Sequence, residues 1–339
     1  MTFEDGSKCV AANTWQFSVT ANQSCRLMKH IILYTALLTA VSTVHADWAV
    51  KDDANTELPG RKVDITQDGV LRARLIYGDG QIKPYLRVQG EEGDGLNEWD
   101  EKQKFPHHRG IFIGWNKIAS DLGSFDLWHF NNGGKMTLSK LEKLEGGKDS
   151  ATIVATIEWR GGKQDAAGSD LILTETRTLT ISRPAAQTTQ VNAQFTLKPA
   201  RDLTLGGDLQ HAGIHFRASA SMMESEKDTT YVWEPDLPGA GGKVESNELK
   251  WVRFTFPIGT RWYHVTQMNA PANPVQELSW RDYGRFGFFF QKPLKKDETL
   301  TLKYRFVTEL AGNLNAKPSA EQQAAFRKAA QSHYDAFVK

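Results

Sequence analysis

The chain has 339 residues, its 41 lysines and arginines almost balance its 40 aspartates and glutamates, and it contains two cysteines. A chain this close to neutral lacks the basic footprint that a phosphate backbone requires, so nucleic acid is excluded as a partner hypothesis. Both cysteines, Cys9 and Cys25, lie near the N-terminus. The rest of the chain therefore has no thiol for a disulfide or for nucleophilic catalysis.

Residues 28–46 have the three regions of a secretory signal peptide. Lys29 supplies a basic start, an apolar run follows up to Val44, and Ala46 is a small residue suited to cleavage. The apolar run of about 14 residues is shorter than the roughly 20 that cross a bilayer. We expect 1–27 to be a mis-annotated leader, with Met28 as the true start. We also expect a periplasmic or secreted mature protein with no membrane span.

The remaining residues, 47–339, have the pattern of an all-β protein. Apolar and polar residues alternate over 152–159, 190–197 and 300–306, and 171–182 is rich in threonine. Alternation with a period of two is typical of strands with one buried face. Glycine-rich turns separate these runs. The pattern predicts a single domain, a large two-sheet antiparallel β-sandwich of the supersandwich type.

One helix is predicted, over 319–338 at the C-terminus. Ser319 can cap its first turn, and Gln322 can return the bond to the backbone of Ser319. One stripe of the helix would face the sheet, namely Phe326, Ala330, Tyr334 and Phe337. We expect the helix to pack against the sandwich as a closing element.

The first candidate site is the segment Phe-Pro-His-His-Arg-Gly at 105–110. His107 and His108 can exchange protons near neutral pH, and Arg109 can hold a carboxylate. Adjacent histidines would point to opposite faces of a strand, but not in a turn. The downstream stretch adds three candidate ligand-binding residues, Asp126, Trp128 and His129. The alternative is structural: a histidine that caps a turn and an arginine paired at a strand end.

The second candidate site is the segment 208–217. In a strand, His211, His215 and Arg217 would share one face, and Gly213 between them would let a ligand approach. His211 and His215 would lie about 13 Å apart along a strand, too far to share one metal ion. A metal site would need histidines from separate segments, so we predict none. The alternative is a solvated strand face.

A third candidate region runs from 262 to 284 and alternates aromatic residues with hydrogen-bonding residues. Its members named as ligand-binding candidates are Trp280, Arg281 and Tyr283. Sugars present flat apolar faces ringed by hydroxyls, and aromatic platforms beside polar groups suit them. Against this, Trp262 and Trp280 can simply be core residues. The sequence contains no nucleophile elbow, phosphate loop or dinucleotide fingerprint.

Four of these segments, in this order, resemble motifs of the PmoA-like family of exported bacterial proteins: His107–Gly110, Asp126–His129, His211–Arg217 and Trp280–Gly284. The resemblance covers roughly 60–310. The family label refers to a methane oxygenase, but this chain lacks the membrane spans of the particulate enzyme. Relatives often have histidine where Asn269 stands here, which removes a titratable group from that loop. The layout also resembles, more loosely, galactose-mutarotase-like sandwiches, which implies sugar binding or transformation.

We therefore predict an exported carbohydrate-active protein that uses histidine acid/base chemistry on a small-molecule or oligosaccharide ligand and needs no cofactor. The candidate catalytic residues are His107, His108 and His211. The candidate ligand-binding residues are Arg109, Asp126, Trp128, His129, His215, Arg217, Trp280, Arg281 and Tyr283. Two alternatives stay open: a non-catalytic sugar-binding module of the envelope, and a metal-dependent oxygenase, as the family label implies.

Overall fold

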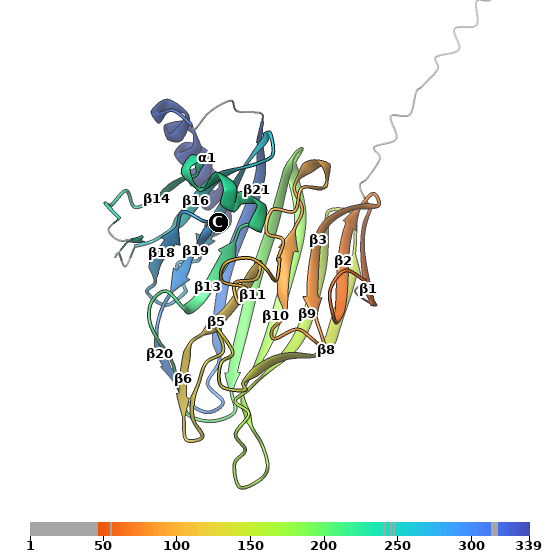
Figure 1. The fold of residues 1–339 in the computed structure, drawn as a ribbon, viewed down its shortest axis with the longest axis vertical. Helices are drawn as coiled ribbons and strands as arrows, with labels where there is room; N and C mark the ends of the chain where they lie inside the picture. Colours follow the sequence, from red (N-terminus) through yellow and green to blue (C-terminus); the bar gives the residue numbers. More distant parts are fainter. Residues whose placement is uncertain (1–46, 55, 240–241, 245, 247, 313–317) are drawn as a thin grey trace, which may run out of the picture. The chain divides into compact units, whose positions relative to one another are not determined.

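The computed structural model of the protein describes residues 47–54, 56–239, 242–244, 246, 248–312 and 318–339, which belong to one compact unit (Figure 1). The predicted leader and signal peptide fall on residues 1–46, outside the described residues. None of the helices in the described ranges is both long and apolar enough to cross a membrane.

The described residues form three antiparallel sheets, which confirms the all-β prediction. From edge to edge, the nine-stranded sheet consists of β1 (Trp48–Ala54), β2 (Arg61–Gln67), β3 (Val70–Tyr77), β4 (Tyr85–Val88), β5 (Ile111–Trp115), β13 (Ala212–Arg217), β19 (Arg285–Phe289), β18 (Glu277–Arg281) and β15 (Lys243–Val244). The eight-stranded sheet consists of β14 (Thr230–Glu234), β16 (Trp251–Ile258), β17 (Arg261–Asn269), β21 (Leu300–Gly312), β11 (Thr188–Pro199), β10 (Leu171–Ala185), β9 (Ser150–Arg160) and β8 (Lys135–Gly146).

A smaller sheet and three helical segments complete the fold. The four-stranded sheet consists of β20 (Lys292–Leu294), β12 (Leu203–Gly206), β6 (Lys117–Ser120) and β7 (Gly123–Phe125). Two 3-10 segments, η1 (Glu91–Gly93) and η2 (Ala220–Asp228), lie in connections. The α-helix α1 spans Ala320–Val338.

The main core lies between the two large sheets. All four predicted strands are present as β9, β10, β11 and β21, and their alternate residues are buried as expected. On β9, for example, Ile153, Ile157 and Trp159 are buried, while the intervening residues are half-buried. Alternation works as a signal here because each strand turns every second side chain toward the opposite sheet.

One ion pair interrupts this apolar core. Arg177 Nε donates to Glu175 at 2.6 Å, and the Trp159 indole donates to the same carboxylate at 2.8 Å. Arg177 also donates to the backbone oxygen of Pro84, 3.0 Å away, just before β4 of the opposite sheet. The buried charges are thus fully paired, and they join the two sheets next to the segment that carries Lys83.

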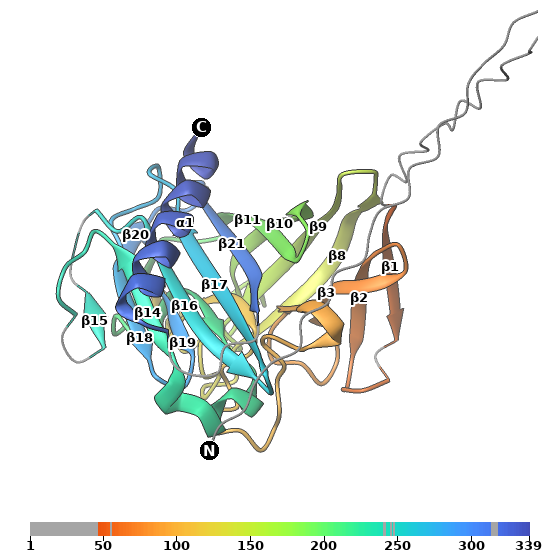
Figure 2. The ribbon, with the colours of Figure 1, turned by 90° about the horizontal axis from the view of Figure 1, so that it is seen from above.

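The C-terminal helix covers the outer face of the eight-stranded sheet (Figure 2). The capping box is confirmed: the Ser319 side chain accepts from the Gln322 backbone, and the Gln322 side chain accepts from Ser319. Ala330 and Tyr334 pack with Trp251, Met268 and Val307 in a separate apolar cluster. The Trp251 indole donates to Gln331 at 2.9 Å, so the helix is also fixed by a directed bond.

Candidate functional site

The outer face of the nine-stranded sheet carries a second apolar cluster, separate from the main core. Ile76, Tyr85, Phe112 and Phe289 stand on β3, β4, β5 and β19, and all are buried. Trp128, from the loop that follows β7, lies on top of them and is fully buried. Loops therefore cover this face, and they bring the candidate residues onto it.

Five histidines gather around Trp128, and we call them the histidine cluster: His107, His108, His129, His211 and His215. The ring centroids of His107 and His108 are 4.3 Å apart, because the two residues lie in a turn and not in a strand. The His107 and His129 rings are 4.5 Å apart, and the His129 and His211 rings 4.7 Å apart. Three segments that are distant in sequence thus meet, as the sequence predicted.

His215 and His108 form the buried floor of the cluster. His215 stands on β13 with its ring 4.8 Å from Trp128 and 5.4 Å from His108. Its neighbours Ile214 and Phe216 point into the main core, so the expected alternation on this strand is confirmed. Gly213 has another role than predicted. A Cβ there would lie 2.3 Å from the carbonyl oxygen of Phe288, so glycine allows close strand pairing and leaves no space for a ligand.

Two carboxylates orient two of these histidines in the same way. His129 Nδ1 lies 3.0 Å from Asp126, and His211 Nδ1 lies 2.8 Å from Asp208. A carboxylate only accepts, so Nδ1 carries the proton in each pair and Nε2 is left as the acceptor. Each aspartate also fixes its turn, by accepting from the backbone of Trp128 and His129 or of Gln210. We call the two pairs the Asp–His dyads. Each is a local turn that leaves the Nε2 atom of its histidine as an acceptor.

The sequence itself holds a signal for the dyads. Both are written Asp-Leu-X-His, at Asp126–His129 and Asp208–His211. Asp208 is absent from the predicted site residues, because the pattern over 208–217 favours a strand from its first residue. The strand begins at Ala212, and the turn before it brings Asp208 back onto His211. A repeated i, i+3 pairing of aspartate and histidine is the pattern that reveals both dyads.

Several buried polar atoms near the cluster have no hydrogen-bond partner among the described residues. They include both ring nitrogens of His108 and of His215, the Trp128 indole nitrogen and the Tyr85 hydroxyl. Burying such a group unpaired costs about 1–3 kcal/mol, and native proteins contain few of them. Their concentration at one place is the mark of a site whose polar groups serve something other than the fold.

Cationic side chains surround the floor of the cluster. Lys83 is fully buried, donates to the backbone oxygen of Trp128 at 2.8 Å, and has its ammonium 3.3 Å from the Phe112 ring centroid. Arg109 stacks on Trp99, with 4.2 Å between the guanidinium and the ring centroid, and hydrogen-bonds Gln81. Arg285 is only 1% exposed. Lys83 and Arg285 were not identified from the sequence, because neither stands in a recognisable motif.

Burial keeps most of the histidines neutral. It lowers the pKa of His107 to about 3, with the nearby positive groups His129 and Lys83 acting in the same direction. Burial also lowers the pKa of His108 and His215 well below the ordinary value of 6.5. The pKa of His211 is lowered by burial too, although Asp208 opposes this. At neutral pH these imidazoles are therefore proton acceptors.

Only part of the fourth predicted stretch, Trp280–Gly284, lies near the histidine cluster. The Tyr283 ring lies 5.4 Å from Phe105 and 4.9 Å from the Arg217 guanidinium, at the rim of the cluster. Arg281 hydrogen-bonds Gln210, next to His211. Trp280 lies on the opposite face of β18, where its ring packs 5.1 Å from Tyr231. The expectation that Trp280 borders the site with the others is therefore wrong, because strand alternation turns it toward the core.

The rest of the third region serves the fold elsewhere. Trp262 is buried. His264 packs on Phe326 of α1 with 4.2 Å between the ring centroids, on the outer face of the other sheet. Asn269 accepts from Asn273 and Gln276 and so holds its own loop. The sequence could not separate these residues from Tyr283, because aromatic and polar types alternate in both places.

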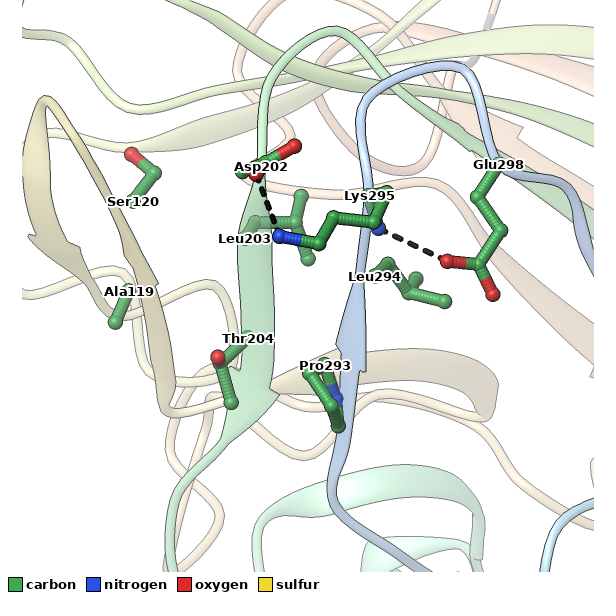
Figure 3. Close-up of a pocket in the computed structure, with 9 residues that line it drawn as sticks. All are labelled: Ala119, Ser120, Asp202, Leu203, Thr204, Pro293, Leu294, Lys295 and Glu298. Carbon is green, nitrogen blue, oxygen red and sulfur yellow. Dashed lines mark hydrogen bonds and ion pairs between the residues drawn. The ribbon is translucent and has the colours of Figure 1, made fainter.

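Two of the largest open cavities lie away from the histidine cluster. One, of about 570 Å³, opens on the four-stranded sheet, where Lys295 pairs with Asp202 at 2.9 Å and its backbone donates to Glu298 (Figure 3). The other, of about 670 Å³, is lined by Gln81 and Trp99 among others and adjoins Arg109. Among the residues that the structure describes, no group of three or more His, Cys, Asp or Glu is arranged to hold a metal ion.

The fold and the site thus define an antiparallel β-sandwich with a histidine cluster on the outer face of one sheet. The chain belongs to the DUF6807 family, described as a family of unknown function, whose model matches residues 62–323. The match carries no oxygenase description, so the PmoA resemblance stays a prediction. The search of curated proteins found no match.

Three solved structures align with this chain at low sequence identity and low TM-score. The Slr1438 protein of Synechocystis is 9% identical, with a TM-score of 0.35 over 70% of this chain and 92% of that one. A glycoside hydrolase family 97 enzyme from a Pseudoalteromonas species is 13% identical, with a TM-score of 0.34 over 71% of this chain and 34% of the enzyme. A GalM/aldose epimerase homologue from C. elegans is 8% identical, with a TM-score of 0.33 over 79% and 100%.

Proposed function

We propose that the protein binds a carbohydrate at the histidine cluster and catalyses proton transfer on it, with the two Asp–His dyads as the acid/base pair. The observation that carries the proposal is the 4.7 Å between the rings of His129 and His211, each oriented by its own aspartate. Two adjacent imidazoles can serve adjacent atoms of one substrate. One takes a proton from a hydroxyl or a C–H group at its Nε2, while the other, after its Nε2 has taken up a proton from water, donates that proton to the neighbouring oxygen.

The protonation states suit this role. Holding Nδ1 with a carboxylate fixes the ring and makes Nε2 more basic, as in the dyads of other hydrolytic and isomerising sites. The buried imidazoles of His108 and His107 continue inward from His129, and their neutral state leaves them able to accept a proton in turn. The site can therefore exchange protons without a cofactor.

A carbohydrate is supported by the residues at the rim. Phe105 and Tyr283 offer aromatic surface that is only partly covered, beside the polar groups of the dyads. A flat apolar face next to hydrogen-bonding groups is the arrangement that sugar rings require. Phe105 adopts a φ of 65°, a strained conformation for a large side chain, and such strain concentrates at ligand-binding positions. Trp128 cannot act as an open platform, because it is fully buried.

The test is a panel of mono- and oligosaccharides incubated with the protein in D₂O and followed by NMR for deuterium uptake or new products. We expect turnover to fall by about 10²–10⁴-fold in His129→Ala and His211→Ala, the usual contribution of a general acid or base. The matched control is His333→Ala, which removes a histidine that also pairs with a carboxylate, Glu309, but on helix α1. Equal activity in all three variants would contradict the proposal.

A non-catalytic sugar-binding module is the alternative that the same panel separates. Calorimetry on the panel would then show binding that Tyr283→Ala weakens, while no sugar exchanges deuterium or forms product. The oxygenase alternative predicts stoichiometric iron or copper in the purified protein, which elemental analysis measures.

A further inference from the structure

Three arginines stand side by side on the face that carries His215. Arg217 on β13 is paired in register with Arg285 on β19, and Arg285 is paired with Arg281 on β18. Directly opposite residues of antiparallel strands lie on the same face with their side chains in contact range. Like charges in such positions destabilise a sheet, so Arg285, which faces an arginine on each side, calls for a compensating negative charge.

The middle arginine has no acidic partner among the described residues. Arg285 is 1% exposed, donates to the Ser279 hydroxyl at 3.1 Å, and has an Nε without a hydrogen-bond partner in the described part of the chain. Arg281 is half-buried and donates to the backbone oxygen of Trp280, 2.6 Å away, and to the Gln210 side chain. These partners are neutral groups, so they do not neutralise the positive charges of Arg281 and Arg285.

The buried arginines elsewhere in the fold show what is missing. Arg177 pairs with Glu175 at 2.6 Å, and Arg253 pairs with Glu309 at 2.7 Å. Arg74 pairs with Asp64, and Arg87 with Glu98. A buried charge is normally retained only with an opposite charge nearby. Arg285 departs from this pattern, because it has no acidic partner among the described residues. It does so near His108 and His215, whose buried imidazoles also lack partners there.

The arginine row is adjacent to the dyads. The bond from Arg281 to Gln210 reaches the residue that precedes His211. The positive charge of Arg285 acts on His211, His108 and His215, so it lies within electrostatic range of both the mouth and the floor of the cluster. A ligand anchored at the arginines would thus extend over the histidines.

We propose that the natural ligand is an acidic sugar, whose carboxylate binds at Arg281 and Arg285 while its ring lies over the Asp–His dyads. This inference rests on the proposed function, which it narrows from carbohydrates in general to uronic acids and their oligomers. The planar fork of a guanidinium matches a carboxylate, and the pairing supplies the negative charge that Arg285 lacks among the described residues. Arg281, the more exposed of the two, makes the first contact.

The experiment uses matched sugars that differ only in CH₂OH or COO⁻ at one carbon, such as glucose with glucuronate and galactose with galacturonate. Affinities are measured by calorimetry on the full chain. We expect each acid to bind at least about tenfold more tightly than its neutral partner at low ionic strength, and the preference to shrink as salt is added. Arg281→Gln should abolish the preference, because the acid loses the guanidinium that distinguishes it from its neutral partner. Arg61→Gln, on the remote strand β2, should leave the preference unchanged.

The outcomes separate the two proposals. Equal affinity for acid and neutral partners would overturn the acidic-sugar inference and leave the carbohydrate proposal standing. No binding of any sugar would overturn both. Glucose 6-phosphate and glucose 6-sulfate serve as a further arm, and tighter binding of these esters than of the uronates would reject the carboxylate as the recognised group. An unchanged preference in Arg281→Gln, with circular dichroism confirming the fold, would reject the arginine row as its anchor.

Discussion

Both large sheets carry histidine and arginine on the face turned away from the shared core, yet the two faces treat them differently. Under α1, His264 Nδ1 lies 2.9 Å from the Thr255 hydroxyl, and the charge of Arg253 is paired with Glu309. On the nine-stranded sheet, both ring nitrogens of His215 lack a partner among the described residues, and Arg285 has no acid there. The first face uses its polar groups to hold a helix. On the second face, these groups lack such partners among the described residues, which lowers stability.

This difference separates polar residues that serve the fold from those that serve a ligand. Burial alone does not, since His264 and His215 are both buried. The distinguishing property is whether the protein supplies a partner for the imidazole and an acid for the guanidinium, because single polar atoms such as Arg253 Nε lack a partner among the described residues on the first face too.

Acid pH should produce the largest effect. Burial lowers the pKa of His264 and of His107 to about 3, and it lowers the pKa of His215 well below the ordinary value of 6.5. Below pH 6.5 these histidines bind protons in the unfolded chain but not in the folded chain. The free energy of unfolding therefore falls as the pH drops from 6.5 toward 3. Each histidine held neutral contributes about 1.4 kcal/mol per pH unit. Urea denaturation between pH 7.5 and 5 measures the slope before carboxylates titrate.

Two variants make the pH experiment specific to the buried groups. His215→Gln should flatten the slope by one proton, and His264→Gln, on the other sheet, should do the same. A slope that does not respond to His215→Gln would mean that this imidazole is protonated in the folded state.

Breaking the core ion pair should have the next largest effect. Glu175→Ala leaves Arg177 charged and buried and also removes the acceptor of the Trp159 indole. We expect a loss of about 3–5 kcal/mol in the free energy of unfolding. The control Glu158→Ala removes a surface partner of Arg160 and should cost about 1 kcal/mol or less. Equal losses in the two variants would show that burial adds nothing to this pair.

On the outer face of the nine-stranded sheet, removing a buried charge should raise the free energy of unfolding. Arg285→Met removes a buried charge that lacks an acid and an Nε that lacks a partner among the described residues, so stability should rise by about 1–3 kcal/mol. Arg253→Met is the matched change on the other sheet, and it should lower stability because Glu309 loses its partner. The denaturant midpoints of the two variants measure both changes in stability. Destabilisation by Arg285→Met would indicate that this arginine serves the fold.

The smallest effect concerns the helix. Ser319→Ala removes the capping box of α1 and should cost about 1 kcal/mol in the free energy of unfolding. The histidine cluster lies on the other sheet, so sugar binding should not change. Loss of binding in this variant would show that the two faces are coupled.

The sequence by itself determined four long strands of the eight-stranded sheet and the helix. Period-two alternation identified β9, β11 and β21, the threonine-rich run identified β10, and the Ser319–Gln322 pair marked the start of α1, because these signals act between residues close in the chain. The same local logic identified all five histidines of the cluster as candidates. It could also have found both dyads, since Asp-Leu-X-His is a turn that pairs its own ends.

Only the tertiary structure decided which candidates meet. Trp280 and Tyr283 stand three residues apart, yet one packs in the core and the other borders the site, because one lies in a strand and the other in the turn after it. Arg285 belongs to the site through strand pairing across the sheet, and Lys83 belongs to it through its bond to the Trp128 backbone. Both interactions join residues far apart in sequence. Whether a buried polar group has a partner is a property of the folded neighbourhood, and no spacing along the chain encodes it.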